Sequence, residues 1–130
     1  MACEMVNKYE TGMQTRRQVL GDVYMDRAEA KNIAFDGPFQ AMITEGAWGT
    51  VWSEDTTTPR ERSMLTLALL AATENFEEIP MHIRAKQNTG AAPQSVLQAF
   101  MHFAVYAGVP AANHAIKLAK QTYAELEVEI

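Results

Sequence analysis

The sequence predicts an all-α fold, and three observations support this. Apolar side chains recur at helical spacing in several segments, helix start signals precede those segments, and no long run of alternating β-branched residues favours a strand. The chain has 130 residues, 48% of them hydrophobic and 21% charged, which suits one compact domain of ordinary size. We therefore predict a single domain over residues 1–130, of which residues 1–8 could be disordered.

The first half of the chain predicts two helices. Met13, Val19 and Leu20 give an apolar stripe near residues 8–20, and Gly21 follows it as a stop signal. Pro38 suits the first turn of a second helix, because its missing N–H would have no partner there. Glycines and tryptophans then interrupt the regular spacing. Residues 36–58 are accordingly predicted to form a short helix followed by an aromatic loop.

Capping signals open the second half of the chain. Thr58 and Glu61 have the spacing of a capping box, Pro59 suits the first helical position, and the leucine-rich run to residue 73 is apolar on nearly every side. Asn75 begins the next segment, which extends to residue 88. Pro80 lies inside this segment and cannot donate a backbone hydrogen bond. Either the regular helix begins at Pro80 or its first turn is distorted.

The last two predicted helices span residues 93–108 and 110–126. A proline opens each of them, and Gly108 lies between them. The whole pattern predicts five to seven helices. Two helices are too apolar for a lone chain of this length to bury, and exposed apolar area costs roughly 25 cal/mol per Å². Self-association would cover these faces, so a homo-oligomer is predicted.

Composition and charge exclude several classes of function. The formal net charge is −5, with 11 Lys and Arg against 16 Asp and Glu, so no basic surface for nucleic acid is expected. Cys3 is the single cysteine, which excludes an internal disulfide, a redox Cys-x-x-Cys pair and a cysteine zinc site. No leader-like or membrane-spanning apolar stretch is evident. We expect a cytoplasmic protein with no membrane partner.

His82 is the best placed of the three histidines for acid–base chemistry. Glu78 lies one helical turn before it, so a helix would bring both to one face, where the carboxylate could bond one ring nitrogen and raise the basicity of the other. An ordinary surface pair has the same spacing. A metal site is disfavoured, because no second histidine lies at metal-ligand spacing nearby. His102 and His114 could still approach His82 in the fold.

Arginines are the candidate anion-binding residues, because a guanidinium group can bind a carboxylate through two parallel hydrogen bonds. Five could do so: Arg16, Arg17, Arg60, Arg62 and Arg84. Arg62 follows the capping box and Arg84 shares the His82 segment, so we select these two. Trp48 and Tyr106 are expected in the core or in a pocket wall, where Tyr106 could donate a hydrogen bond. No glycine-rich phosphate loop suggests a nucleotide.

Segments from about residue 9 to residue 126 resemble those of the carboxymuconolactone decarboxylase family. The N-terminal ones are Tyr9-x-x-Gly12-Met13-Gln14-x-Arg16-Arg17-x-Val19-Leu20-Gly21, Asp26-Arg27, Phe39-Gln40-x-Met42-Ile43-Thr44 and Ala47-Trp48-Gly49-x-x-Trp52. The later ones are Pro59-Arg60-x-Arg62-Ser63, Glu78-x-x-x-His82-x-Arg84-Ala85 with Asn88-x-Gly90, and Tyr106-x-Gly108-x-Pro110-Ala111-Ala112-Asn113. The last two motifs also occur in the wider alkylhydroperoxidase D-like family, whereas the N-terminal and Trp-Gly segments are more specific to decarboxylases.

The resemblance implies an alkylhydroperoxidase D-like helical bundle, usually a hexamer, that acts as a lyase without a cofactor or metal. It implies conversion of 4-carboxymuconolactone, a small anionic lactone, to 3-oxoadipate enol-lactone and CO2 in the protocatechuate branch of the β-ketoadipate pathway. The peroxidase branch needs a Cys-x-x-Cys pair, and this sequence has Asn75 and Glu78 at those positions. Thiol chemistry of that kind is therefore absent.

The implied reaction requires groups that hold a diacid, stabilise an oxyanion and deliver one proton to carbon. The lactone accepts the electrons itself, which explains why no cofactor is needed. The predicted site therefore comprises catalytic His82 and Glu78 together with substrate-binding Arg62, Arg84, Trp48 and Tyr106.

The sequence also departs from the family pattern. Gly46 stands where the family often has His, and Gln98 and His102 replace an expected Glu and Gln. Pro80 replaces a helix former. Two alternatives therefore accompany the decarboxylase hypothesis. One is a lyase or isomerase of the same fold that acts on another unsaturated lactone or enolisable acid. The other is a helical oligomer without enzymatic activity.

Overall fold

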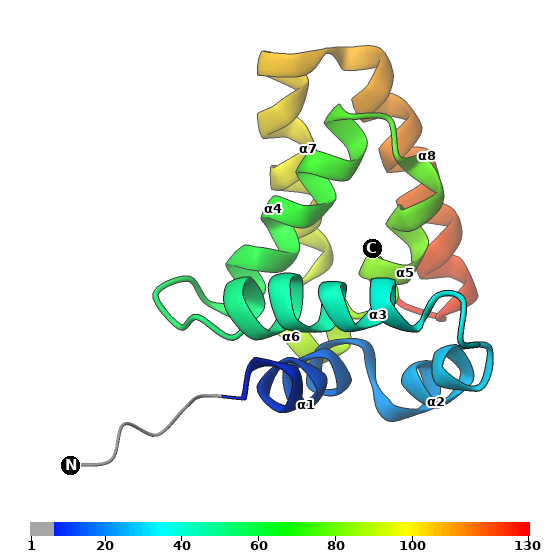
Figure 1. Ribbon diagram of the computed structural model, residues 1–130. Helices are drawn as coiled ribbons and strands as arrows, with labels where there is room; N and C mark the ends of the chain where they lie inside the picture. Colours follow the sequence, from blue (N-terminus) through cyan, green and yellow to red (C-terminus); the bar gives the residue numbers. More distant parts are fainter. Residues whose placement is uncertain (1–6) are drawn as a thin grey trace. The chain divides into compact units, whose positions relative to one another are not determined.

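The computed structural model describes residues 7–130, apart from the side chains of residues 86 and 87. Every regular element within this range is a helix, which confirms the all-α prediction. The chain divides into two compact units, residues 1–57 and 58–130, whose helices are labelled in Figure 1. The single domain over residues 1–130 stays a prediction.

The first unit begins with α1 (Lys8–Leu20), which has the predicted bounds. The side-chain oxygen of Asn7 caps it by accepting a hydrogen bond from the backbone N–H of Glu10 at 3.1 Å. Gly21 ends it at φ 89°, a conformation that favours glycine. Lys8 is thus the first residue of a helix that Asn7 caps, and residues 1–6, the rest of the segment that could be disordered, lie outside the described residues.

Two more α-helices follow, α2 (Asp22–Ala30) and α3 (Gly37–Ile43), with Pro38 in the first turn of α3 as predicted. The next segment is a π-helix, η1 (Thr44–Trp52), which corrects the prediction of an aromatic loop. Side-chain hydroxyls stabilise its wide turns, since Thr50 Oγ1 donates to the carbonyl oxygen of Glu45 at 3.0 Å. The indole rings of Trp48 and Trp52 stack with centroids 5.0 Å apart.

Two glycines allow α1 and η1 to pack closely. A Cβ atom on Gly12 would collide with the backbone carbonyl of Thr44, and one on Gly49 would collide with the backbone carbonyl of Lys8. Only glycine leaves space for the two backbones at these points. The close approach holds Thr44, which is 1% exposed, against the face of α1.

The second unit contains α4 (Pro59–Ala72), the 3₁₀ turn η2 (Phe76–Glu78), α5 (Ile79–Arg84), α6 (Lys86–Thr89), α7 (Pro93–Ala107) and α8 (Val109–Glu125). The capping box of α4 is formed as predicted, with bonds in both directions between Thr58 and Glu61. Pro80 lies in the first turn of α5, which begins at Ile79 after the 3₁₀ turn, so the regular helix begins close to the proline. In Figure 1, α4, α7 and α8 run side by side.

Buried apolar side chains from α4, α5, α7 and α8 form the core of the second unit. Phe100, Leu67, Ile79 and Ile83 are fully buried there. Among residues 7–130, no helix is both long enough and apolar enough to cross a membrane.

Candidate functional site

His82 lies in the middle of α5, and its neighbours on the helix determine its environment. Ile79 and Ile83 are fully buried, and the imidazole between them is half-buried. Burial lowers the pKa of His82 below its ordinary value of 6.5, because a desolvated imidazole loses more by carrying a charge. The ring is therefore mainly neutral near pH 7.

Glu78 does not hold His82, which corrects one prediction. Glu78 ends the 3₁₀ turn before α5, and its side chain is exposed. Among the described residues, no hydrogen bond or ion pair joins Glu78 to His82, so the pKa of the imidazole is lowered by burial, not raised by a carboxylate. The tighter 3₁₀ turn changes the angle between the two side chains, and water competes for an exposed carboxylate.

The two selected arginines have different surroundings. Arg84, in the last turn of α5, forms an ion pair with Glu125 of α8 at 2.7 Å between Nη2 and Oε2, with 51% of its side chain exposed. Residues two apart on a helix do not share a face, so Arg84 is turned away from His82. Arg62 lies in the first half of α4 and is half-buried, and its Nε atom is enclosed by the protein.

Trp48 and Tyr106 lie in different units of the chain. Trp48 is buried in the core of the first unit, stacked on Trp52. Tyr106 is 80% exposed at the end of α7, where its ring lies 5.2 Å from that of His102. Neither residue lines a cavity described below, so their predicted role in a pocket wall has no support from a contact.

One cavity of the second unit contains a predicted site residue. It has a volume of about 520 Å³ and lies where η2 and the start of α5 meet α8. Glu78 lines it, and so does His114, whose ring stacks on Phe76 with centroids 4.1 Å apart. His114 thus lines the same cavity as Glu78, a proximity that the sequence could not show because the two residues are far apart in the chain.

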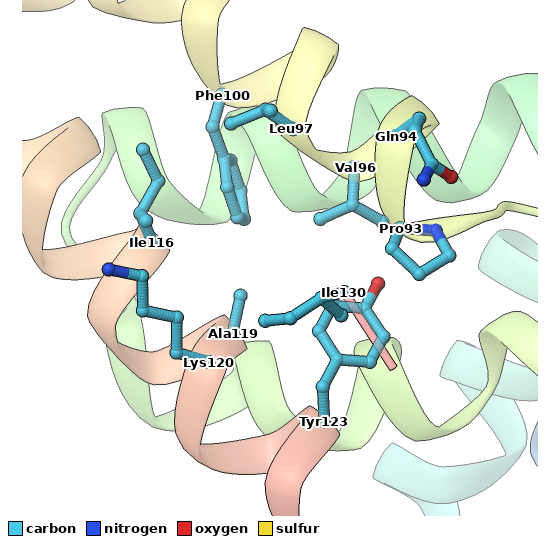
Figure 2. Close-up of a pocket in the computed structure, with 10 residues that line it drawn as sticks. All are labelled: Pro93, Gln94, Val96, Leu97, Phe100, Ile116, Ala119, Lys120, Tyr123 and Ile130. Carbon is cyan, nitrogen blue, oxygen red and sulfur yellow. The ribbon is translucent and has the colours of Figure 1, made fainter. Parts of the chain in front are cut away.

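A second cavity, of about 290 Å³, lies between α7 and α8 and is almost entirely apolar (Figure 2). Phe100 and Val96 point into it from α7, Tyr123 from α8, and Ile130 from the C-terminal segment. Burial raises the pKa of Tyr123 to about 12, so its hydroxyl is a neutral donor. None of the predicted site residues lines this cavity. Its walls are apolar helix positions, and helical spacing in a sequence does not distinguish a residue that lines a cavity from one that only packs in the core.

No group of three or more His, Cys, Asp and Glu side chains is placed to hold a metal ion in the described part of the chain. The side chains that are present suit acid–base and anion-binding chemistry. They are a half-buried imidazole with a lowered pKa, a carboxylate at a cavity and guanidinium groups on neighbouring helices.

Two known proteins match most of the chain, and a third matches a shorter stretch. The chain is 33% identical to 4-carboxymuconolactone decarboxylase of Acinetobacter baylyi over 93% of its own length and 90% of that protein. It is 34% identical to nitrosuccinic acid decarboxylase of Metarhizium robertsii over 88% of its length and 80% of that protein. A 42-residue stretch is 52% identical to 4-carboxymuconolactone decarboxylase of Pseudomonas putida, covering 88% of that sequence.

All three relatives are named as decarboxylases, which supports a carboxy-lyase. The sequence pattern of one family, described as the carboxymuconolactone decarboxylase family, matches residues 37–121, more than half of the chain. That stretch includes α3, η1 and most of the second unit, with His82 inside it. Together with the identity to relatives over most of their length, the match shows that this chain belongs to the carboxymuconolactone decarboxylase family.

Proposed function

We propose that the chain decarboxylates 4-carboxymuconolactone to 3-oxoadipate enol-lactone and CO2, as a cytoplasmic step of protocatechuate degradation. The observation that carries this proposal is the 33% identity to a relative of that name over nine-tenths of both chains. The half-buried imidazole of His82 within the matched family region supports it.

The proposed reaction needs charged groups that bind the substrate and stabilise negative charge, and one proton for carbon. The bond between the ring carbon and its carboxylate breaks, and the electron pair passes through the ring double bond to the lactone carbonyl oxygen. The resulting dienolate takes one proton on carbon to give the enol-lactone. The protein must therefore bind the anionic substrate, stabilise the developing oxyanion and supply that proton.

We assign the proton transfer to His82. Its half-buried imidazole is mainly neutral before the substrate binds, because burial lowers its pKa. A substrate carboxylate that enters the same desolvated region would raise that pKa again, since an opposite charge favours the protonated ring. The proton taken up on binding is then the one delivered to the dienolate. Glu78 would contribute its carboxylate at the cavity that it shares with His114.

Anion binding is assigned to Arg62 and Arg84. The half-buried Arg62 would attract a substrate carboxylate strongly, because burial weakens competition from water. Arg84 must first leave Glu125, and exposed ion pairs of this kind contribute less than about 1 kcal/mol. That exchange costs little. Trp48 and Tyr106 stay predictions.

The proposal includes a homo-oligomer, for which the resemblance favours a hexamer. Leu97, Met101 and Val105 follow one another at spacings of four on α7 and are 42%, 50% and 81% exposed. A monomer would leave this apolar stripe in water, whereas a second copy of the chain would bury it.

A second candidate function is decarboxylation of a nitro acid such as nitrosuccinate. The 34% identity to a nitrosuccinic acid decarboxylase favours it as much as the first relative favours the lactone. In both substrates the electron pair left by the departing carboxylate has an acceptor: the lactone carbonyl, reached through the ring double bond, or the nitro group. Gly46, which stands where the family often has His, is the sequence feature that could separate the two.

The test is CO2 release from 4-carboxymuconolactone and from nitrosuccinate by purified protein, without added metal or cofactor. We expect turnover of the lactone and a fall of at least about 100-fold in kcat for His82→Ala, the ordinary contribution of a general acid. His102→Ala, a change at an exposed histidine, serves as the control. The Gly46→His variant is included because a Cβ at this position has open space around it.

Three outcomes would contradict the proposal in different ways. Turnover of nitrosuccinate alone would support the second candidate. Lactone turnover that appears only in Gly46→His would favour another lactone or enolisable acid as the substrate. If neither acid releases CO2, the remaining hypothesis is a helical oligomer without enzymatic activity.

A further inference from the structure

The apolar cavity between α7 and α8 contains none of the residues assigned to the proposed reaction (Figure 2). Val96 and Phe100, which are fully buried, line it, so it reaches into the core of the second unit. Protein cores seldom leave space of this size, because the atoms around a void lose their packing contacts. A cavity of about 290 Å³ that remains between two well-packed helices is therefore a candidate ligand site.

The walls of the cavity determine which kind of molecule fits. Most of the lining side chains are aliphatic or aromatic, and the polar ones are Gln94, Lys120 and Tyr123. A water-sized group takes up about 30 Å³, so the cavity has room for about ten non-hydrogen atoms. Water finds few hydrogen-bond partners in such a space, whereas a hydrocarbon chain or ring would leave water and gain packing contacts. The cavity thus fits an apolar body of that size.

Lys120 is the charged residue among those that line the cavity. Figure 2 shows its hydrocarbon stem along the wall and its Nζ atom at the edge, and the side chain is exposed. No carboxylate from either helix neutralises this ammonium group. The sequence of α7 has no acidic residue, and the acidic residue of α8, Glu125, pairs with Arg84. Glu127 and Glu129 follow α8 and do not line the cavity.

The Lys120 ammonium group forms no ion pair or hydrogen bond among residues 7–130, so it is available to an anion at the edge of the cavity. The chain as a whole carries a formal net charge of −5. A single cation beside an apolar space is therefore a local exception to the overall charge, and it selects the sign of the ligand.

We propose that this cavity binds a monocarboxylic acid, with its apolar body between α7 and α8 and its carboxylate paired with Lys120. One cation at the edge matches one carboxylate, and the apolar interior would penalise a second charge. A diacid such as the substrate of the proposed function does not fit these requirements. The site is thus separate from the proposed reaction.

Octanoate, a straight-chain monocarboxylate of the size that the cavity holds, is the probe, and isothermal titration calorimetry measures its Kd. Hexanoate is two methylenes shorter and should bind roughly tenfold more weakly, because each buried methylene adds to the affinity. Lys120→Gln should weaken octanoate binding about fivefold, the upper range for an exposed ion pair. Octanol, which has the same chain and no charge, should bind wild type and Lys120→Gln with the same Kd.

Lys117→Gln is the matched control, because it removes the same charge from the same helix at an exposed residue that does not line the cavity. Its Kd for octanoate should stay within twofold of wild type. Ala119→Leu tests the space itself, since the side chain of Ala119 points into the cavity in Figure 2. The larger side chain should fill the space and weaken octanoate binding at least about tenfold, with helix content by circular dichroism unchanged.

Leu97 lines this cavity and also belongs to the exposed stripe on α7, so a second copy that covers the stripe would lie next to the cavity. The titration is therefore repeated with Val105→Glu, which places a charge on the stripe at a residue that does not line the cavity. A Kd within twofold of wild type would support a site built by one chain. Loss of octanoate binding in this variant would overturn a site built by α7 and α8 of one chain.

Absence of saturable octanoate binding to the wild-type protein would also overturn the proposal, and so would an equal Kd for octanoate in wild type and Lys120→Gln. Wild-type affinity in a folded Ala119→Leu variant would show that octanoate binds elsewhere. If Ala119→Leu does not fold, the comparison of octanoate with octanol in Lys120→Gln decides. Octanoate binding needs no turnover, so a failed CO2 assay leaves this site standing and a failed titration leaves the proposed function standing.

Discussion

The imidazole of His82 sits on a short helix between two isoleucines, Ile79 and Ile83, that are fully buried. Spacing alone suggests that Glu78 controls this ring, yet the surroundings of α5 control it more strongly. Desolvation acts on the whole ring, whereas an exposed carboxylate one turn away is screened by water. Burial therefore sets the protonation state of the residue proposed to move the proton.

The lowered pKa of His82 predicts a specific dependence of stability on pH. The unfolded imidazole takes up a proton near its ordinary pKa of 6.5, but the folded one resists protonation until a lower pH. Stability is thus fully present above 6.5 and is lost as the pH falls toward the folded pKa. We expect Tm to fall on acidification from about pH 7 to about pH 5, less steeply in His82→Asn than in wild type.

Differential scanning fluorimetry over this pH range measures the two slopes. His102→Asn, at an exposed position, should keep the wild-type slope. Equal slopes in wild type and His82→Asn would show that the imidazole of His82 is not desolvated in solution.

At the scale of single elements, η1 is the part of the chain that sequence patterns describe least well. Residues with a period of 3.6 indicate an α-helix, but the wider turns of a π-helix shift the apolar positions out of that register. Gly46 and Gly49 also predict an interruption of the helix, because glycine disfavours regular helical structure. The structure shows instead that Gly49 allows close packing on Lys8, while the Cβ of any residue at position 46 would have open space.

This difference predicts opposite effects for two alanine substitutions. Gly12→Ala should destabilise the protein by about 2–3 kcal/mol, because the new methyl group must push α1 away from the backbone of Thr44. Gly46→Ala adds the same atoms without a contact, and alanine is the better helix former, so its stability should be unchanged or raised by about 0.5 kcal/mol. Urea unfolding of both variants measures the free energies. A Gly12→Ala variant as stable as wild type would contradict the close approach of α1 and η1.

At the scale of the whole molecule, the apolar stripe on α7 stays exposed to water in a single copy of the chain. Leu97, Met101 and Val105 are exposed on α7, whereas Phe100 and Phe103 of the same helix are buried. A helix that is apolar on both faces is stable in water only when a neighbour covers the second face. A second copy of the chain is the neighbour proposed above.

Val105→Glu should break this association, because a charge on the stripe would be buried without a partner. We expect a smaller assembly by size-exclusion chromatography with light scattering, with unchanged helix content by circular dichroism. Val23→Glu is the control, a change of the same kind on α2 at a residue that is 68% exposed. An unchanged mass for Val105→Glu would show that the apolar stripe on α7 is not part of the interface between copies of the chain.

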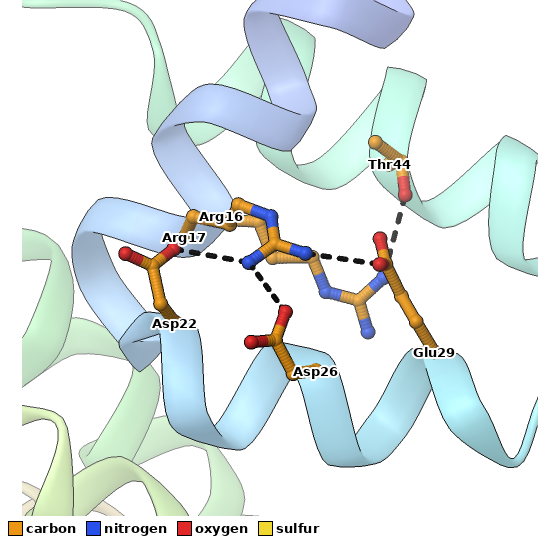
Figure 3. A network of polar contacts seen from close by, with 6 residues as sticks. All are labelled: Arg16, Arg17, Asp22, Asp26, Glu29 and Thr44. Carbon is orange, nitrogen blue, oxygen red and sulfur yellow. Dashed lines mark hydrogen bonds and ion pairs between the residues drawn. The ribbon is translucent and has the colours of Figure 1, made fainter.

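Most helix boundaries were predictable from local chemistry. Capping residues and prolines mark where α1, α3, α4, α7 and α8 begin, since orphan N–H groups must be satisfied at the start of any helix. Asp22–Ala30 carries too few apolar residues to stand out in the sequence, and in the structure this helix buries Met25 and pairs its carboxylates with Arg17 (Figure 3). The 3₁₀ turn before α5 depends on how the chain enters the core around Pro80.

The sequence by itself determined the all-helical class, the family resemblance and the residue types available for acid–base and anion-binding chemistry. Only the tertiary structure decided which charges are matched. Among the described residues, Arg17 has three carboxylates and its neighbour Arg16 has none, while Glu78 lines a cavity with His114 and forms no bond to His82. The physical reason is that capping and periodicity act within a few residues, whereas desolvation and charge pairing depend on what distant segments bring to the same place.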